Sequence, residues 1–212
     1  CAEIKELGIA PLTTTGRYTY YAREGLLLPL IKRIGGTEAM ERMMRLEPGA
    51  FNNEVVIKAA SMYRELIDLG YMQQGFTGMD HTTSQMEFIS GRAAMIPVAT
   101  WFENEMADML TDDFKFMPMV IPAVEGGAGS GDSILVSLIG DWTVFSNSKN
   151  KDVAADFIKY MTSLAYSRKV AEQMKTLSPI KGAEDVISSE PLRAVAALVD
   201  NASVTFHQHV FL

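Results

Sequence analysis

A tryptophan with amide and carboxylate side chains close behind it is the group of residues in this sequence best suited to chemistry. Trp101 is followed by Asn104, with Glu103 and Glu105 on either side of that asparagine. An aromatic ring can stack on the C–H face of a sugar while amides and carboxylates hydrogen-bond the sugar hydroxyls. The residues therefore predict a carbohydrate-binding surface at Trp101. The alternative, that Trp101 is a core residue, stays open at this point.

Two predicted helices and a short strand position this tryptophan. Ser84 and Glu87 have the spacing of a capping box, which predicts a helix that begins at Ser84 and ends at Gly91. Residues 93–99 are few and apolar, as in a buried strand. Trp101 then lies at the mouth of a second helix, so we expect its ring to be at least partly exposed and to line the largest concave surface of the chain.

Other aromatic residues could form further walls of the same cleft. Three tyrosines crowd one short segment, and a second tryptophan follows an aspartate after a predicted strand. Rings with polar tips suit a surface that binds sugars. These groups are our candidates for sugar contacts, and we expect Asp141 with Trp142, and at least one of Tyr18, Tyr20 and Tyr21, to face the cleft of Trp101 and Asn104.

The resemblance to a known family becomes specific at three segments. FISGRAAM at residues 88–95, followed by Trp101, resembles the signature of extracellular solute-binding proteins of carbohydrate ABC importers. In that family a helix ending in F-x-x-G-K-A-A-M leads through a strand to a tryptophan that stacks on the sugar. Residues 146–158 resemble the family's S-K-N-K-x-x-A-x-x-F-I, and residues 16–21 resemble an aromatic stretch, with threonine where proline is usual. The segments follow the family's order.

The resemblance implies an α/β fold with the two-lobed architecture of periplasmic binding proteins. This chain would cover mainly the second lobe and part of the first. Residues 1–117 would be the second-lobe segment that carries the sugar-stacking tryptophan, and residues 118–175 the returning part of the first lobe. Residues 176–212 would return to the second lobe. By the family's order, we expect the chain to be an internal piece of a larger receptor.

Such a piece would lack some of its packing partners. The strand-like residues Ile134, Val136 and Leu138, and the stripe of Val153, Phe157 and Met161, would be left partly uncovered. Exposed strand edges and apolar patches seek partners. We therefore expect the fragment to self-associate through this block or to bind a missing piece of the protein.

The function implied by the resemblance is capture of a mono- or oligosaccharide and its delivery to the membrane permease of an ABC importer. The protein would act outside the cytoplasm, in the periplasm or as a cell-surface lipoprotein, without a cofactor or metal and without catalysis. Hinge closure of two lobes around a ligand requires no catalytic group. The resemblance assigns sugar stacking to Trp101.

Composition agrees with a soluble binding domain. Of the 212 residues, 48% are hydrophobic, as in an ordinary globular protein. The net charge of −7 argues against nucleic acid as a partner. The only cysteine, Cys1, is expected to lie inside an amphipathic helix of a longer protein, whose tail Gly8 ends. The glycine-rich segment 125–133 has Asp132 where a phosphate loop needs lysine, so a flexible loop is the better interpretation. His207 and His209 lack a third ligand with metal-site spacing.

Two other function classes remain. A glycosidase needs two carboxylates across one cleft, and Glu103 and Glu105, two apart on a helix, would point to different sides. A non-catalytic interaction module would bury both tryptophans. His81, in the predicted loop 75–83, is expected to be a surface residue.

Periodicity and caps also predict further helices and strands: helices over 26–34, 37–46, 53–69, 151–162, 166–175 and 189–200, and strands over 9–12, 114–121 and 134–139.

Overall fold

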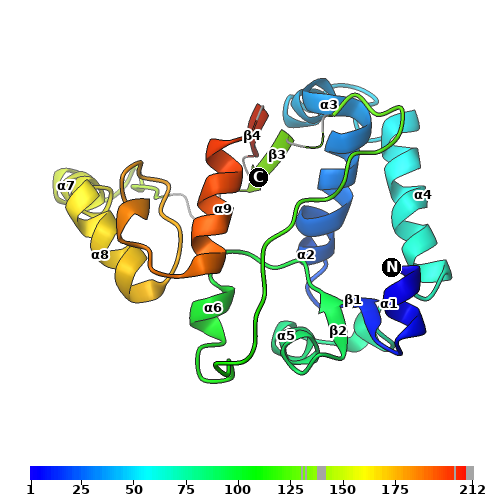
Figure 1. The fold of residues 1–212 in the computed structure, drawn as a ribbon. Helices are drawn as coiled ribbons and strands as arrows, with labels where there is room; N and C mark the ends of the chain where they lie inside the picture. The colour runs from blue at the N-terminus through cyan, green and yellow to red at the C-terminus, as the bar shows by residue number, and fades with distance from the viewer. Residues whose placement is uncertain (130, 132, 138–141, 203, 209–212) are drawn as a thin grey trace.

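The chain is a mixed α/β structure rich in helices (Figure 1). The computed structural model describes residues 1–129, 131, 133–137, 142–202 and 204–208, with only the backbone of 133–137 and 204–208. The elements, in chain order, are α1 (Ala2–Glu6), β1 (Ala10–Leu12), α2 (Tyr20–Ala22), a π turn (Arg23–Leu27), α3 (Leu28–Met44), α4 (Glu54–Asp68), a 3-10 turn (Phe76–Gly78), α5 (His81–Ile89), β2 (Ala93–Met95), α6 (Phe102–Glu105), β3 (Ser133–Ser137), α7 (Lys151–Met161), α8 (Leu164–Met174), a 3-10 turn (Glu184–Val186), α9 (Glu190–Asp200) and β4 (Val204–Gln208).

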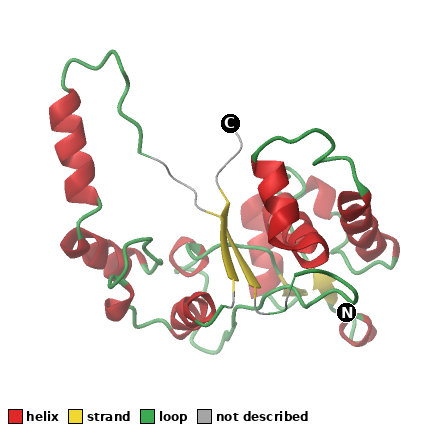
Figure 2. Cartoon of the chain, turned by 90° about the horizontal axis from the view of Figure 1, so that it is seen from above, coloured by secondary structure: helices red, strands yellow, loops and turns green. Residues whose placement is uncertain are grey.

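Two short parallel sheets join segments that are far apart in the sequence. Ala10 of β1 pairs with Ala93 of β2, and Leu12 also bridges to Met72. In the second sheet, β3 and β4 pair in parallel from Ser133 opposite Val204 onward. This sheet lies between α9 and α3, with α7 and α8 at one end of the molecule and α4 at the other (Figures 1 and 2).

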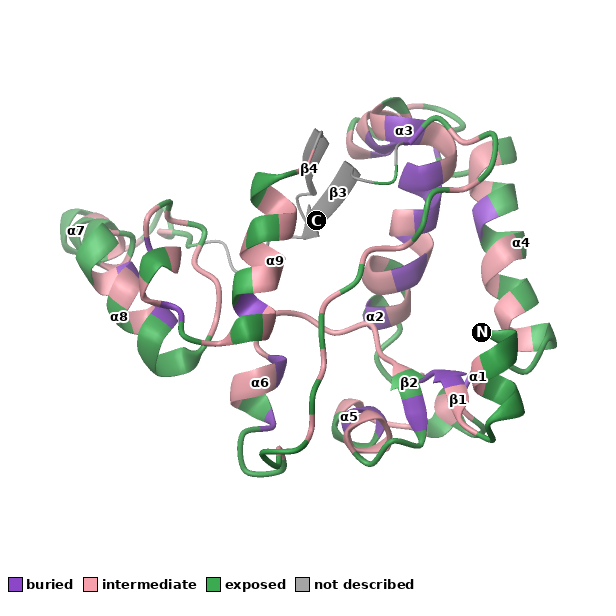
Figure 3. Cartoon of the chain, viewed as in Figure 1, coloured by how far each residue is buried: buried purple, intermediate pink, exposed green. Residues whose placement is uncertain are grey.

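The main core lies between α3 and α4. Leu28, Ile31 and Met40 of α3 are almost fully buried and pack with Ala59 of α4. The predicted cap of α4 is confirmed, since the Asn53 side chain accepts hydrogen bonds from the backbone N–H groups of the first turn. Figure 3 shows buried positions concentrated along α3, while α7 shows none.

A kink divides α3 where the sequence predicts two helices. Gly36 has φ +67° and ψ −164°, which takes it out of the helical region. Carbonyl groups in the turn before Gly36 therefore lack their helical N–H donors. The glycine-rich segment supplies N–H groups in place of those donors. Ala128 donates its N–H to the Ile34 carbonyl over 2.9 Å, and Gly129 donates to the Arg33 carbonyl over 3.0 Å. The described residues of this segment thus cap the carbonyl groups at the kink of α3.

Arg33 fastens both sides of that cap. Its Nε donates to the Ile121 carbonyl over 2.7 Å, and an Nη donates to the Gly131 carbonyl over 2.9 Å. The neighbouring Lys32 is also buried, and burial followed by the charge of Arg33 lowers the pKa of its ammonium group. Arg33 therefore holds the long connection from α6 to β3 against α3.

The structure exposes more surface than a compact protein of this size. Its accessible area is 13041 Å², whereas a folded monomer of this mass exposes about 9,700 Å². Val153 and Phe157 of α7 are 69% and 52% exposed, which confirms the uncovered stripe for these two residues. Side chains of Ile134 and Val136, and all of Leu138, lie outside the described residues. Self-association through this block stays a prediction.

Two predicted elements are wrong. The helix over Ser84 begins earlier, at His81, because the Asp80 carboxylate accepts from the Thr83 N–H and caps it; Ser84 instead donates its hydroxyl to the His81 carbonyl. Residues 114–121 form no strand in the described part of the chain. Their aromatic residues pack edge-on against other rings, Phe114 on Phe88 and Phe116 on Phe102, rather than joining a sheet.

Candidate functional site

The carboxyl ends of β1 and β2 gather polar and aromatic residues. Both strands run in the same direction, so Thr13 to Thr15 after β1 and Trp101 after β2 leave the sheet at one edge. The three threonines are at most 1% exposed, and the hydroxyls of Thr13 and Thr14 have no hydrogen-bond partner among the described residues. In α/β folds the crevice beyond this edge is where ligands bind.

Three rings form a stack beside this edge. Tyr21 lies between Tyr20, at 4.2 Å between ring centroids, and His81, at 4.1 Å. Tyr21 is buried and its hydroxyl lies 3.0 Å from His81 Nε2, whereas Tyr20 is 38% exposed and presents its outer face. The prediction that His81 is a surface residue is wrong, because the stack leaves its side chain only 12% exposed.

A carboxylate from α6 completes the cluster. Glu105 Oε2 lies 3.2 Å from His81 Nε2 and accepts a hydrogen bond from Gln85 Nε2 over 3.0 Å. Gln85 is fully buried, and its Oε1 has no partner among the described residues. Two side chains of α5 therefore fix the orientation of Glu105, which is 40% exposed at the surface.

Tyr21 links the ring stack to Trp101. Burial raises the pKa of the Tyr21 hydroxyl well above its ordinary value, Tyr20 and Glu105 raise it further, and a hydrogen bond with Trp101 acts in the opposite direction. Trp101 itself is half-buried at the N-terminus of α6, as expected for a ring that contributes one face to a ligand. Pairwise contacts thus connect Trp101, through the buried Tyr21, to Tyr20 and His81, and His81 to Glu105.

The raised pKa of Tyr21 predicts a loss of stability at alkaline pH. Because the folded state holds the proton more tightly than the unfolded state, the free energy of unfolding should fall as the pH rises above about 10. In Tyr21→Phe that fall should be smaller, and Tyr63, whose pKa burial also raises, should account for the remainder. Urea unfolding of the wild type and of Tyr21→Phe at about pH 8 and 11 measures this fall in the free energy of unfolding. An equal fall in the two proteins would contradict the prediction.

The second carboxylate of α6 faces another part of the molecule. Glu103 accepts a hydrogen bond from the Ser189 hydroxyl and lies 3.5 Å from Lys175 Nζ. Glu105 faces α5 instead, so the two side chains diverge as their spacing predicts. Hydrolysis of a glycosidic bond needs two carboxylates across one cleft, and these two do not form such a pair.

Comparison with known families places the chain. The family model described as bacterial extracellular solute-binding protein matches residues 1–166. The chain belongs to this family. Relatives named as binding proteins, BAB2_0491 of Brucella abortus (strain 2308) and BRA0748/BS1330_II0741 of Brucella suis biovar 1 (strain 1330), are each 27% identical over 147 residues. That alignment covers 69% of this solute-binding protein and 32% of either relative.

Solved structures show the same fold. A chitin oligosaccharide binding protein matches with a TM-score of 0.80 and 21% identity, over 97% of this chain and 52% of its own. RafE in complex with raffinose matches with a TM-score of 0.69 and 20% identity, over 97% and 53%. The sugar transporter BL01359 from Bacillus licheniformis, in complex with stachyose, matches at 0.66 and 13%, over 97% and 52%. This solute-binding chain therefore spans about half the length of these structures and has the α/β fold of a part of them.

The residues predicted for the site of the solute-binding protein are distributed unevenly. Trp101, Tyr20 and Tyr21 lie together, and Asn104 is half-buried on the same short helix. Tyr18 is 50% exposed in the preceding loop. Elsewhere, Trp142 packs edge-on against Phe157 of α7, and Asp141 lies outside the described residues. Whether Trp142 and Asp141 face the same cleft stays a prediction.

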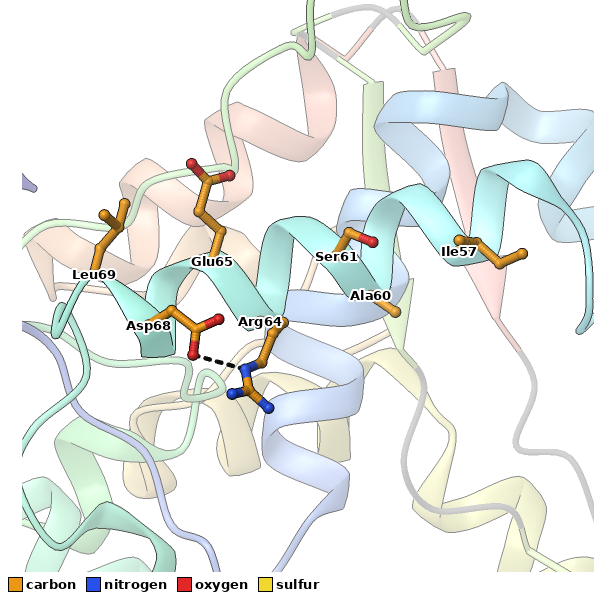
Figure 4. Close-up of a pocket in the computed structure, with 7 residues that line it drawn as sticks. All are labelled: Ile57, Ala60, Ser61, Arg64, Glu65, Asp68 and Leu69. Atoms are coloured by element: carbon orange, nitrogen blue, oxygen red, sulfur yellow. Dashed lines mark hydrogen bonds and ion pairs between the residues drawn. The ribbon is translucent and has the colours of Figure 1, made fainter.

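Two hollows of the solute-binding protein lie away from Trp101. One, of about 550 Å³, is a shallow surface along the outer face of α4 (Figure 4), lined by Ile57, Ala60, Ser61, Arg64, Glu65, Asp68 and Leu69. The other, of about 380 Å³, lies between the connection at Pro118 and Val120 and the small residues of α9. Neither includes Trp101. The ring is partly exposed as expected, and the concave surface expected at it stays a prediction.

Sequence reasoning misses two members of the site. It places His81 in a surface loop and gives Gln85 no role, whereas it does predict Glu105 as a hydrogen-bonding neighbour of Trp101. One signal was present for the threonines: a run of hydroxyl residues directly after the strand-like residues 9–12 fits the carboxyl end of a parallel strand. No comparable local signal marks His81, whose partner Tyr21 lies 60 residues earlier.

Proposed function

We propose that the protein captures a mono- or oligosaccharide and delivers it to the membrane permease of an ABC importer, acting outside the cytoplasm. The observation that carries this proposal is the half-buried Trp101, joined through Tyr21 to a stack of rings beside an oriented carboxylate. Apolar ring faces next to fixed hydrogen-bonding groups suit the two kinds of surface on a sugar. The named ligands of the structural relatives, chitin oligosaccharide and raffinose, support the same ligand class.

The contacts are assigned as follows. Trp101 stacks on the sugar, with Tyr20 as a second exposed ring, and Asn104 and Glu105 reach its hydroxyls. Residues 1–117 form the segment that carries this surface. Residues 118–175 and 176–212, as the returning part of the first lobe and the return to the second, complete the architecture. The remaining assigned contacts, made when the lobes of the intact protein close, are Tyr18, Asp141 and Trp142.

Calorimetric titration of the intact protein with a panel of neutral oligosaccharides tests the proposal. We expect saturable binding of at least one oligosaccharide with no change in the sugar, as judged by chromatography after prolonged incubation. Release of shorter sugars would favour the glycosidase alternative. Absence of binding to every member of a broad panel would overturn the proposal.

A further inference from the structure

One oxygen of the Glu105 carboxylate is bound and the other is open. His81 and Gln85 both approach Oε2, at 3.2 and 3.0 Å. Oε1 has no hydrogen-bond or ion-pair partner among the described residues, and 40% of the side chain is exposed. An ionised carboxylate only accepts hydrogen bonds. The open oxygen is therefore a pre-oriented acceptor for a donor that comes from solvent or from a ligand.

No lysine or arginine forms an ion pair with Glu105 in the described part of the chain. Its ion-pair partner there is His81. Lys175 lies against Glu103, on the other side of α6. Asp80 caps the N-terminus of α5, and hydrogen bonds from Thr83, with smaller contributions from the charges of Arg17 and His81, lower the pKa of its carboxyl. The ion-pair partner of Glu105 is thus a histidine, with no lysine or arginine beside it to neutralise a second carboxylate.

We infer that this site takes neutral, hydroxyl-bearing sugars and rejects acidic sugars such as uronates. The inference rests on the proposed function, because it concerns the ligand that stacks on Trp101. A sugar hydroxyl donates to Glu105 Oε1 in a charge-assisted hydrogen bond. A uronate carboxylate has no proton to donate and carries the same charge, so it leaves the acceptor unsatisfied and adds repulsion across a few ångströms.

The test compares matched neutral and acidic ligands on the intact protein. The tightest-binding hexose oligosaccharide of the panel is titrated beside its C6-oxidised form and the methyl ester of that form; a xylo-oligosaccharide is titrated beside its glucuronate-substituted form. The Kd of the acidic form should be at least about tenfold higher than that of the neutral form, because like charges repel near a protein surface. The methyl ester should regain most of the affinity, since it has the same skeleton without the charge.

Two variants separate the role of Glu105 from general charge. In Glu105→Gln, the preference for the neutral ligand should fall to about threefold or less, because the repulsive charge is gone. Glu103→Gln removes an equal charge from the other side of the same helix and should keep the wild-type preference. Unfolding transitions show that both variants are folded.

The outcomes distinguish the two levels of the argument. Equal binding of acidic and neutral forms by the wild-type protein, or an unchanged preference in Glu105→Gln, would overturn the inference and leave sugar binding intact. Failure of every oligosaccharide to bind would overturn the proposed function, and the inference with it.

Discussion

Replacing Gly127 with alanine should lower the free energy of unfolding by about 2–4 kcal/mol. A Cβ atom at this position would lie 2.2 Å from the Arg33 carbonyl oxygen, which is backbone and cannot turn away. The segment must then withdraw, and the hydrogen bonds from Ala128 and Gly129 to the carbonyl groups at the kink within α3 are lost with it. Chemical denaturation measures the change.

A second variant repeats this test at another glycine, and a third serves as a control. Gly129→Ala places its Cβ 2.2 Å from the Lys32 carbonyl oxygen and should destabilise to a similar extent. Gly78→Ala is the control, since no atom lies within 4 Å of the added carbon. If the free energy of unfolding of Gly127→Ala lies within about 0.5 kcal/mol of the wild-type value, the close approach of this segment to α3 is wrong.

Replacing Trp101 with alanine should weaken sugar binding by about 1–3 kcal/mol, or about five- to 150-fold in Kd. The ring is half-buried, so a ligand can cover its open face and remove that apolar surface from water. The rest of the site remains in place, because the stack of Tyr20, Tyr21 and His81 is built without Trp101. Calorimetric titration with the oligosaccharide found in the panel gives the change.

Trp101→Phe is the matched control for this loss. It keeps a flat ring at the junction but gives up the indole N–H and part of the area, so its affinity should lie between those of Trp101→Ala and the wild type. Wild-type affinity in Trp101→Ala, with the fold intact, would show that the sugar does not stack here and would move the site elsewhere.

Local signals in the sequence predicted much of the fold. The Asn53 cap, the glycine after α5 and the Ser189 start of α9 depend on backbone groups within a few residues, so the pattern alone reveals them. The helix start at Ser84 failed because two caps compete there. Asp80, four residues earlier, captures the first free N–H groups, and the Ser84 hydroxyl is left to bond the helix carbonyl before it.

Contacts between distant residues were the part that the sequence could not supply. Residues 114–121 have the apolar content of a strand, but whether they pair depends on a neighbouring strand edge. In the structure, Phe114 and Phe116 meet rings from α5 and α6 instead. The site divides in the same way: the family-like segment located Trp101, whereas His81 and Glu105 depend on how α5 and α6 meet.

The pairing of β1 with β2 also bears on how the protein folds. Ala10 and Ala93 become neighbours only after a long intervening chain has been closed, and contacts of this range form late and slowly. The ring stack and the Glu105 network need the same closure, since they join residues on both sides of it. Exchange protection at the amide of Thr13, which donates to the Met95 carbonyl, should therefore appear in the same kinetic phase as ligand binding.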